Sequence, residues 1–233
     1  MSNFVINPSA FVVPTPDPDQ SWDWSSSSGW TLSRSTISGD KFNWNDDATG
    51  TNTFLWSYTA IDTLDDNKNT IRFPFDLDVL SGSGNQDLAS VTFAVVNTPG
   101  QNSPVLSYGF RIGFGSGSFV PVYQGFTTPG TTGGGASNIN QENGGDYTSF
   151  ALSPATAIIY IQFQRTASDS VTIGIYSDSG YTTLVEEETF TISGTWTGLD
   201  NFQVSTRNGS QEETRSVSGT MLPDLQIWTD SNV

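Results

Sequence analysis

Short runs of alternating apolar and polar residues fill most of the chain, and the clearest of them lies between residues 157 and 192. There Ile159, Ile161 and Phe163 alternate with Tyr and Gln residues, and the alternation resumes over Val171–Ile175. A period of two residues is typical of a half-buried β-strand. Polar turns at 167–170 and 177–180 separate the runs, so the pattern predicts three antiparallel strands in a β-meander.

Similar runs extend this prediction along the chain. We expect further strands at residues 29–32, 41–44, 53–59, 70–80, 91–96, 107–114, 118–124, 147–152, 199–206 and 219–228. Proline donates no ladder hydrogen bond, so Pro74 suggests an edge position or a bulge, and Pro121 a peripheral strand. Residues 127–146, rich in Gly, Thr and Asn, are expected to form a functional or mobile surface loop. No stretch supports a helix of ordinary length. The fold class is therefore all-β, a two-sheet antiparallel sandwich.

Residues 1–20 differ from the rest of the chain. Their four prolines favour extended backbone over helix or ladder. We therefore divide the chain into an extended Pro-rich N-terminal arm, 1–20, and a β-sandwich domain, 21–233. The arm carries two apolar triplets that are candidates for docking to a partner or sister subunit: Phe4, Val5, Ile6, Phe11, Val12 and Val13. An ordinary first strand packed on its own domain is the alternative.

The composition excludes several classes of function. The 233 residues carry a net charge of −16, and the eight basic residues form no cluster, which disfavours binding to nucleic acid or to an anionic membrane. The absence of Cys and His removes disulfides, thiolate metal sites and the commonest general base. We find no signal peptide and no apolar run long enough to form a transmembrane helix.

Several segments in a fixed order resemble a known family of domains. They include TIRFPFDLDV, VTFAVVN, YGFRIGF, VTIGIYSDSGYTTLVEEETFTIS, LDNFQVSTRN and the closing GT–LPDLQIW. Over about residues 29–228 this order resembles the laminin-G-like, concanavalin-A-like jelly-roll domains. The resemblance implies a concanavalin-A-like jelly roll. Domains of this kind bind glycans or proteins, act as structural modules on virus particles and extracellular assemblies, or in one branch hydrolyse glucans.

The hydrolytic branch has Glu-x-Asp-x-x-Glu on one strand, and the nearest match in this chain is Glu186-Glu187-Glu188. Glu186 and Glu188 share a face of the expected strand, with backbones about 6.5–7 Å apart. Retaining hydrolysis needs carboxyl groups about 5–5.5 Å apart, so the spacing alone does not exclude it. However, no Asp lies between them and no aromatic neighbour follows the family pattern. We interpret this run as a solvated or charge-protected strand face and expect no enzyme activity.

The same resemblance implies a possible structural Ca²⁺ between an N-terminal segment and the last strand. Calcium takes carboxylate and carbonyl oxygens. Asp224 stands where the family has a closing acidic pair, although Pro223 replaces its partner. Asp46 and Asp47 are further candidate metal ligands, as are the acidic residues at 65–66. Turn-forming aspartates that bind no metal are the alternative.

The seven tryptophans divide by context. Three lie in predicted strands and are expected in the core: Trp44, Trp56 and Trp228. Three lie in loop-like contexts and are candidates for exposed contacts with carbohydrate or with a protein partner: Trp22, Trp24 and Trp196. Sequence alone does not separate these two uses of an exposed ring.

Two functions fit these observations. The first is a non-enzymatic virion structural protein, a capsid decoration or a tail or fibre component. It would lie at the virion surface as a homo-oligomer and dock to other virion proteins through its arm. The missing signal peptide, the absence of Cys and His, and the acidic composition motivate it. The alternative is a carbohydrate-binding lectin-like module that recognises host or environmental polysaccharide.

Overall fold

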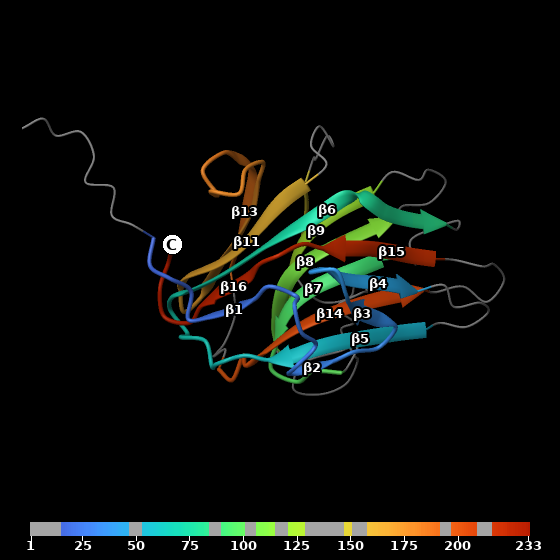
Figure 1. The fold of residues 1–233 in the computed structure, drawn as a ribbon. Coiled ribbons are helices and arrows are strands. Elements are labelled where there is room, and N and C mark those ends of the chain that lie inside the picture. The colour runs from blue at the N-terminus through green and yellow to red at the C-terminus, as the bar shows by residue number, and fades with distance from the viewer. Residues whose placement is uncertain are drawn as a thin grey trace, which may run out of the picture.

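The computed structural model describes residues 15–46, 53–83, 90–100, 106–114, 121–128, 147–150, 158–191, 197–208 and 216–233. These residues form 16 strands (Figure 1). The strands are β1 (Gln20–Trp22), β2 (Trp30–Thr31), β3 (Ser35–Ile37), β4 (Phe42–Asp46), β5 (Thr53–Ala60), β6 (Asn69–Ser83), β7 (Ser90–Val96), β8 (Ser107–Phe114), β9 (Pro121–Thr128), β10 (Tyr147–Phe150), β11 (Ile158–Ala167), β12 (Ser170–Tyr176), β13 (Leu184–Thr191), β14 (Asn201–Asn208), β15 (Ser216–Met221) and β16 (Leu225–Trp228). Among these residues, no helix is long and apolar enough to cross a bilayer.

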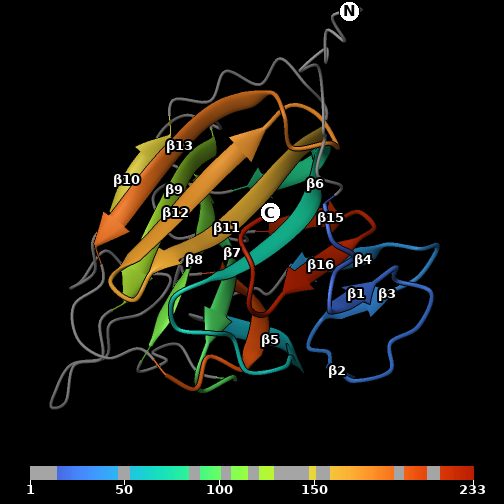
Figure 2. The same cartoon turned by 90° about the vertical axis from the view of Figure 1, so that its left-hand side faces the viewer.

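The strands form two antiparallel sheets that pack face to face. Sheet A has the order β13-β12-β11-β6-β15-β4-β3, and β16 pairs with both β6 and β1. Sheet B has the order β10-β9-β8-β7-β14-β5-β2. In Figure 2 the strands β13, β12, β11 and β6 lie in front, and β9, β8 and β7 run behind them. The all-β, two-sheet antiparallel sandwich expected from the sequence is confirmed.

The core lies between the sheets because alternate residues of each strand point inward. In the meander, Phe163 of β11 is the register partner of Ile173 of β12, and both side chains are fully buried. From sheet B, the ring of Phe93 packs 5.1 Å from that of Phe73 and 5.5 Å from that of Phe75, measured between centroids. Each aromatic pair at such a distance stabilises the fold by about 0.5–1.5 kcal/mol beyond the contribution of its buried area. Rings from both sheets therefore join the two layers.

The meander predicted from the alternation pattern is confirmed. β11 pairs antiparallel with β12, and β12 pairs antiparallel with β13. The turns fall near the predicted positions, at 168–169 and 177–183. The period-2 pattern fixes the register because a shift by one residue would turn every apolar side chain outward.

Pro74 lies in a central strand, so the edge position predicted for it is wrong. β11 pairs with one side of β6, and β15 and β16 share the other side. The main-chain oxygen of Pro74 accepts a hydrogen bond from the amide of Leu222, 3.0 Å away, at the junction between β15 and β16. In antiparallel pairing the N–H and C=O of a residue point the same way, so the missing N–H faces this interruption of the ladder. A proline is tolerated there because no partner strand needs its donor.

The first and last described segments hold each other. β1 pairs with β16, the indole N–H of Trp228 donates to the carbonyl oxygen of Pro16 at 2.8 Å, and the Asp19 carboxylate accepts from the amide and hydroxyl of Thr229. The single closing strand expected at 219–228 is instead two strands, β15 and β16, which pair with different parts of β6. Residues 16–20 of the predicted arm thus contact the domain.

Gly219 gives a test of the packing between β15 and β4. A Cβ at this position would lie 2.3 Å from Cζ2 of Trp44, whose ring stacks on Phe75 at 5.5 Å. We expect Gly219→Ala to lower the free energy of unfolding by about 1–3 kcal/mol, because the core would be overpacked. Urea unfolding measures the change. In a Trp44→Leu background the added cost of Gly219→Ala should be much smaller; equal costs in both backgrounds would show that the ring is not the cause.

Candidate functional site

Trp24 belongs to the core and is not the exposed contact residue that the sequence predicted. It is 1% exposed, its indole N–H donates to the carbonyl oxygen of Leu222 at 2.8 Å, and its ring centroid lies 5.4 Å from those of Trp30 and Phe42. The physical reason is that the 23–29 connection folds across the end of the sandwich and carries this ring inward. Trp22, in β1, is half-buried and packs against the same core cluster, so part of its ring stays at the surface.

Several predicted residues lie outside the described ranges and stay predictions. These are the arm residues Phe4, Val5, Ile6, Phe11, Val12 and Val13, together with Trp196 and Asp47. Most of the Gly-rich loop at 127–146 also lies outside them. Asp46 ends β4, where its backbone pairs with Val217.

Asp224, the first candidate metal ligand, lies near the carboxylate of Asp23. Asp224 is exposed, and desolvation together with the neighbouring Asp23 carboxylate raises its pKa. The Asp23 carboxylate accepts hydrogen bonds from the amide and hydroxyl of Ser25, as in an ordinary turn. Ca²⁺ takes six to eight oxygen ligands, and no group of three acidic side chains converges anywhere in the described part of the chain.

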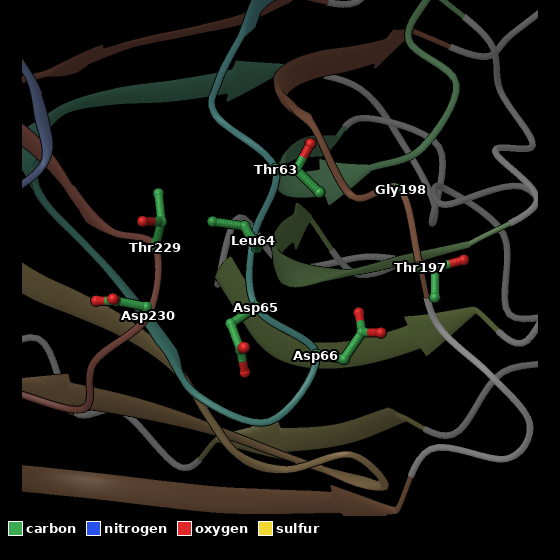
Figure 3. A pocket seen from close by; sticks show the side chains of 8 residues that line it. All are labelled: Thr63, Leu64, Asp65, Asp66, Thr197, Gly198, Thr229 and Asp230. Atoms are coloured by element: carbon green, nitrogen blue, oxygen red, sulfur yellow. The ribbon is translucent and has the colours of Figure 1, made fainter.

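A shallow pocket of about 440 Å³ opens where the β5–β6 connection meets the C-terminal segment (Figure 3). Its lining residues are Thr63, Leu64, Asp65, Asp66, Thr197, Gly198, Thr229 and Asp230. The carboxylates point in different directions (Figure 3). The Asp65 carboxylate accepts hydrogen bonds from the amides of Asn67 and Lys68, and these hydrogen bonds lower its pKa. The hydrogen bonds to the Asp65 carboxylate thus come from the turn that follows it.

The outer face of sheet A, turned away from sheet B, carries an aromatic cluster around Arg72. The guanidinium carbon lies 4.4 Å from the ring centroid of Tyr181 and 5.3 Å from that of Trp228. Nε donates to Oε1 of Gln162 at 2.7 Å, and Nη2 donates to the carbonyl oxygen of Val233 at 2.6 Å. Because these donors are engaged within the chain, the cluster acts as an anchor for the 177–183 loop and the final residues.

Asp178 shapes that loop. Its carboxylate accepts hydrogen bonds from the amides of Gly180, Thr182 and Thr183 and from the Thr182 hydroxyl. Desolvation pushes the pKa of Asp178 upward, but these hydrogen bonds outweigh it and lower the pKa to about 2. The network holds Tyr181 in a left-handed conformation, φ 53°, which few non-glycine residues adopt.

The outer face of sheet B, turned away from sheet A, has a different character. Register pairing aligns Trp56, Ser205 and Thr92 in one row across β5, β14 and β7. The next row begins with Tyr58 and Gln203. These two neighbouring rows combine aromatic rings with amide and hydroxyl groups, which are side-chain types found in small-ligand sites.

In both rows the rings are half-buried, whereas the polar side chains are buried completely. Four buried polar atoms of this face have no hydrogen-bond partner: Nε1 of Trp56, Oγ of Ser205, Nε2 of Gln203 and Oγ of Ser107. Two others in the described residues, the indole nitrogens of Trp30 and Trp44, belong to the inner layer. Leaving such a group unpaired costs about 1–3 kcal/mol.

A described segment borders these buried, unpaired groups. The amide of Gly100 donates to Oε1 of Gln203 at 2.8 Å, and Gly100 lies against the Tyr58 ring. Asn97 closes the base of the segment through its backbone and side-chain bonds with Leu106. The side-chain oxygen of Gln203 thus has a hydrogen-bond partner, and its side-chain nitrogen has none within the described residues.

The site differs from the one that the sequence indicated. Trp56 was expected in the core, but its strand neighbour Ser57 faces inward and Trp56 faces outward. The alternation Phe54, Trp56, Tyr58 showed that these rings share a face; it did not show which face. Glu186 and Glu188, in contrast, lie half-buried on edge strand β13.

Comparison with known proteins identifies the fold. No family model matches the chain, and no curated protein matches its sequence. The chain is similar to the exoplasmic/lumenal domain of VIP36 in its Ca²⁺-bound form, with a TM-score of 0.56 and 10% identity over 86% of this chain and 83% of that one. A legume lectin-like domain from Entamoeba histolytica has a TM-score of 0.55 and 8% identity, over 85% of this chain and 90% of that one. Peanut lectin has a TM-score of 0.53 and 8% identity, over 90% of this chain and 97% of that one.

At this level of identity the similarity shows the fold alone. The protein has the concanavalin-A-like jelly-roll fold of legume-lectin-like domains, as the sequence resemblance implied. Among these neighbours, VIP36 has also been solved with Ca²⁺ and Man3GlcNAc bound.

The Asp178 network predicts a pH effect with a definite sign. A carboxylate with an ordinary pKa near 3.9 when unfolded and about 2 when folded stabilises the fold above pH ~4, and this contribution is lost as the pH falls toward 2. We expect Asp178→Asn to be less stable than the wild type at pH 7 and the difference to shrink toward pH 2. Denaturant unfolding across pH measures it. Ser179→Ala, in the same loop, is the control; a difference that does not change with pH would contradict the assignment.

The raised pKa of Asp224 predicts a pH effect on stability of the opposite sign. Its raised pKa means that ionisation destabilises the fold, so the stability it contributes is lost as the pH rises through its folded pKa. Without added calcium, Asp224→Asn should raise the free energy of unfolding at pH 7 by a few tenths of a kcal/mol, since the group is largely exposed. Thermal unfolding with and without Ca²⁺ checks this. A variant that loses stability only when Ca²⁺ is present would instead identify Asp224 as a metal ligand.

Proposed function

We propose that the protein is a non-enzymatic carbohydrate-binding module whose ligand lies on the outer face of sheet B. The observation that carries this proposal is the set of unpartnered buried groups of Trp56, Ser205, Gln203 and Ser107 on one face. A ligand that supplies hydrogen-bond partners would relieve their cost. No comparable set remains at the described cluster around Arg72.

The aromatic rings of the same face support a sugar ligand. Trp56 and Tyr58 are half-buried, so part of each ring reaches the surface beside the buried polar groups. An apolar ring face next to a few placed donors is the usual composition of a small-ligand site. The lectin folds of the structural neighbours are consistent with this use.

The virion role stays a prediction from the sequence. Its docking residues in the arm lie outside the described ranges, and residues 16–22 are held against the protein's own β16. The same holds for the homo-oligomer and for attachment to other virion proteins. A carbohydrate-binding module at the surface of a virion would satisfy both functions.

Two variants distinguish a binding role of the unpartnered groups from a structural role. Trp56→Phe and Ser205→Ala each remove a polar atom that has no partner in the protein, so the free energy of unfolding should stay the same or rise slightly. Affinity for the glycan should fall about tenfold for each lost bond, which corresponds to about 1.4 kcal/mol. A glycan array identifies the ligand, and isothermal calorimetry measures the affinity.

Trp228→Phe is the matched control. Its indole N–H has a partner, the Pro16 carbonyl oxygen, so its loss should lower stability and leave affinity unchanged. The proposal fails if no glycan binds, or if Trp56→Phe costs stability without weakening a glycan that does bind.

A further inference from the structure

We propose that residues 231–233 form a strap over a peptide-binding surface on the outer face of sheet A, and that an extended peptide with one carboxylate displaces the strap and binds there. This surface lies on the opposite side of the sandwich from the face proposed for carbohydrate, so the two sites are independent. Three features of the described residues point to it: the course of the strap, the atoms that hold the strap, and the charge of Arg72.

The strap crosses the sheet instead of extending it. After β16 the chain turns back, and in Figure 2 its last residues, drawn in red, lie in front of β6. The main-chain oxygen of Ser231 accepts a hydrogen bond from the hydroxyl of Thr70 on β6, 3.0 Å away. The main-chain oxygen of Val233 accepts from Nε2 of Gln164 on β11, 3.4 Å away. Ser231 and Val233 are half-buried and Asn232 is exposed, so the strap lies over two strands with one side toward solvent.

The contacts of the strap are those by which a surface recognises the main chain of a peptide. The Thr70 hydroxyl donates to the Ser231 oxygen and accepts from the Val233 amide, 3.4 Å away, so one side chain binds both polar groups of a peptide backbone. Arg72 and Gln164 both donate to the Val233 oxygen. Since all these bonds use main-chain atoms of the strap, another extended chain can make the same bonds.

The surface is held in place by contacts that do not involve the strap. Nε of Arg72 donates to Gln162, and the guanidinium carbon lies 4.4 Å from the ring centroid of Tyr181. The Tyr181 ring packs edge-on against the rings of Tyr160 and Tyr176, with centroids 5.8 Å and 5.5 Å away. The donors are therefore already positioned for a ligand, which lowers the cost of ordering them on binding.

The charge of Arg72 indicates the chemistry of the ligand. In the described part of the chain Arg72 pairs with no Asp or Glu side chain, although the sequence contains 24 acidic residues. A carboxylate in place of the Val233 oxygen would accept from the guanidinium, and such charge-assisted bonds are about twice as strong as neutral ones. Glu187 of β13 stands in the same register row as Arg72 and would repel a run of acidic residues. One carboxylate on an otherwise uncharged main chain is thus the best complement.

Truncation after Asp230 separates the strap from the surface. The pentapeptide with the sequence of residues 229–233 is then added back as the free acid or as the C-terminal amide, two forms that differ only in one carboxylate. By NMR titration we expect the truncated protein to bind the acid roughly tenfold more tightly than the amide, because only the acid offers this carboxylate to Arg72. The intact chain should bind the acid roughly tenfold more weakly than the truncated protein, because its strap competes.

Two variants of the truncated protein assign the contact. Arg72→Gln should bring the ratio of acid to amide affinity toward one. Lys68→Gln, the same change of charge at an exposed position just before β6, should leave the ratio unchanged. Equal affinities for acid and amide in the truncated protein would overturn the peptide-binding surface. Binding of glucuronate in preference to the acid peptide would overturn it as well, since the surface would then take sugar acids.

Hydrogen exchange on the intact chain provides a test that does not depend on the truncated protein folding. The Val233 amide should exchange well before that of Phe163 in β11, because the strap opens without unfolding the sheet. The acid peptide should speed the exchange of the Val233 amide, and the amide form should not. Exchange of Val233 only on global unfolding, or an exchange rate that the acid peptide leaves unchanged, would show that the strap is not displaced by such a ligand.

Discussion

The contact between β6 and Phe93 of β7 is the constraint on which the rest of the structure depends. β6 is hydrogen-bonded to β11 on one side and to β15 and β16 on the other, so it joins segments far apart in the sequence. Its inner rings, Phe73 and Phe75, meet Phe93 from sheet B. Because side chains alternate along a strand, the inward position of Phe93 turns Thr92 and Ala94 outward. The packing of the core thereby sets which residues line the outer face of sheet B.

The period-2 pattern was sufficient to predict most of the long strands. It works where apolar residues alternate with polar ones, as in β11 and β12, because one face is then plainly the buried one. The short strands β1 and β3 have no such pattern, since two or three residues cannot show a period. They exist because partners far away in the sequence, β16 and β4, offer a free ladder edge. Sequence order alone does not reveal those partners.

Strand β5 shows why the candidate site could not be predicted. Its aromatic residues alternate with Ser57 and Thr59, and hydrophobicity assigns the rings to the core. Inside the fold, however, the Ser57 hydroxyl bonds to the amide of Ser33 and the hydroxyl of Ser35, and the Thr59 hydroxyl donates to the carbonyl oxygen of Gly29. These partners satisfy the polar side of β5 at the end of the sandwich, where sheet A is formed by short strands. With the hydroxyls satisfied inside, the rings of Trp56 and Tyr58 face outward.

The two outer faces of the sandwich differ in how completely the chain satisfies their polar groups. Both faces carry tyrosine or tryptophan rings beside glutamine, and by composition they look alike. On sheet A, Arg72 donates to Gln162 and to the carbonyl oxygen of Val233, and the Gln162 amide donates to the Tyr176 hydroxyl, so the cluster has partners within the chain. On sheet B, Gln203 is bonded only at its oxygen, and the indole of Trp56 is unpaired. A buried donor without a partner lowers stability, so the ligand proposed for this face would offset that cost.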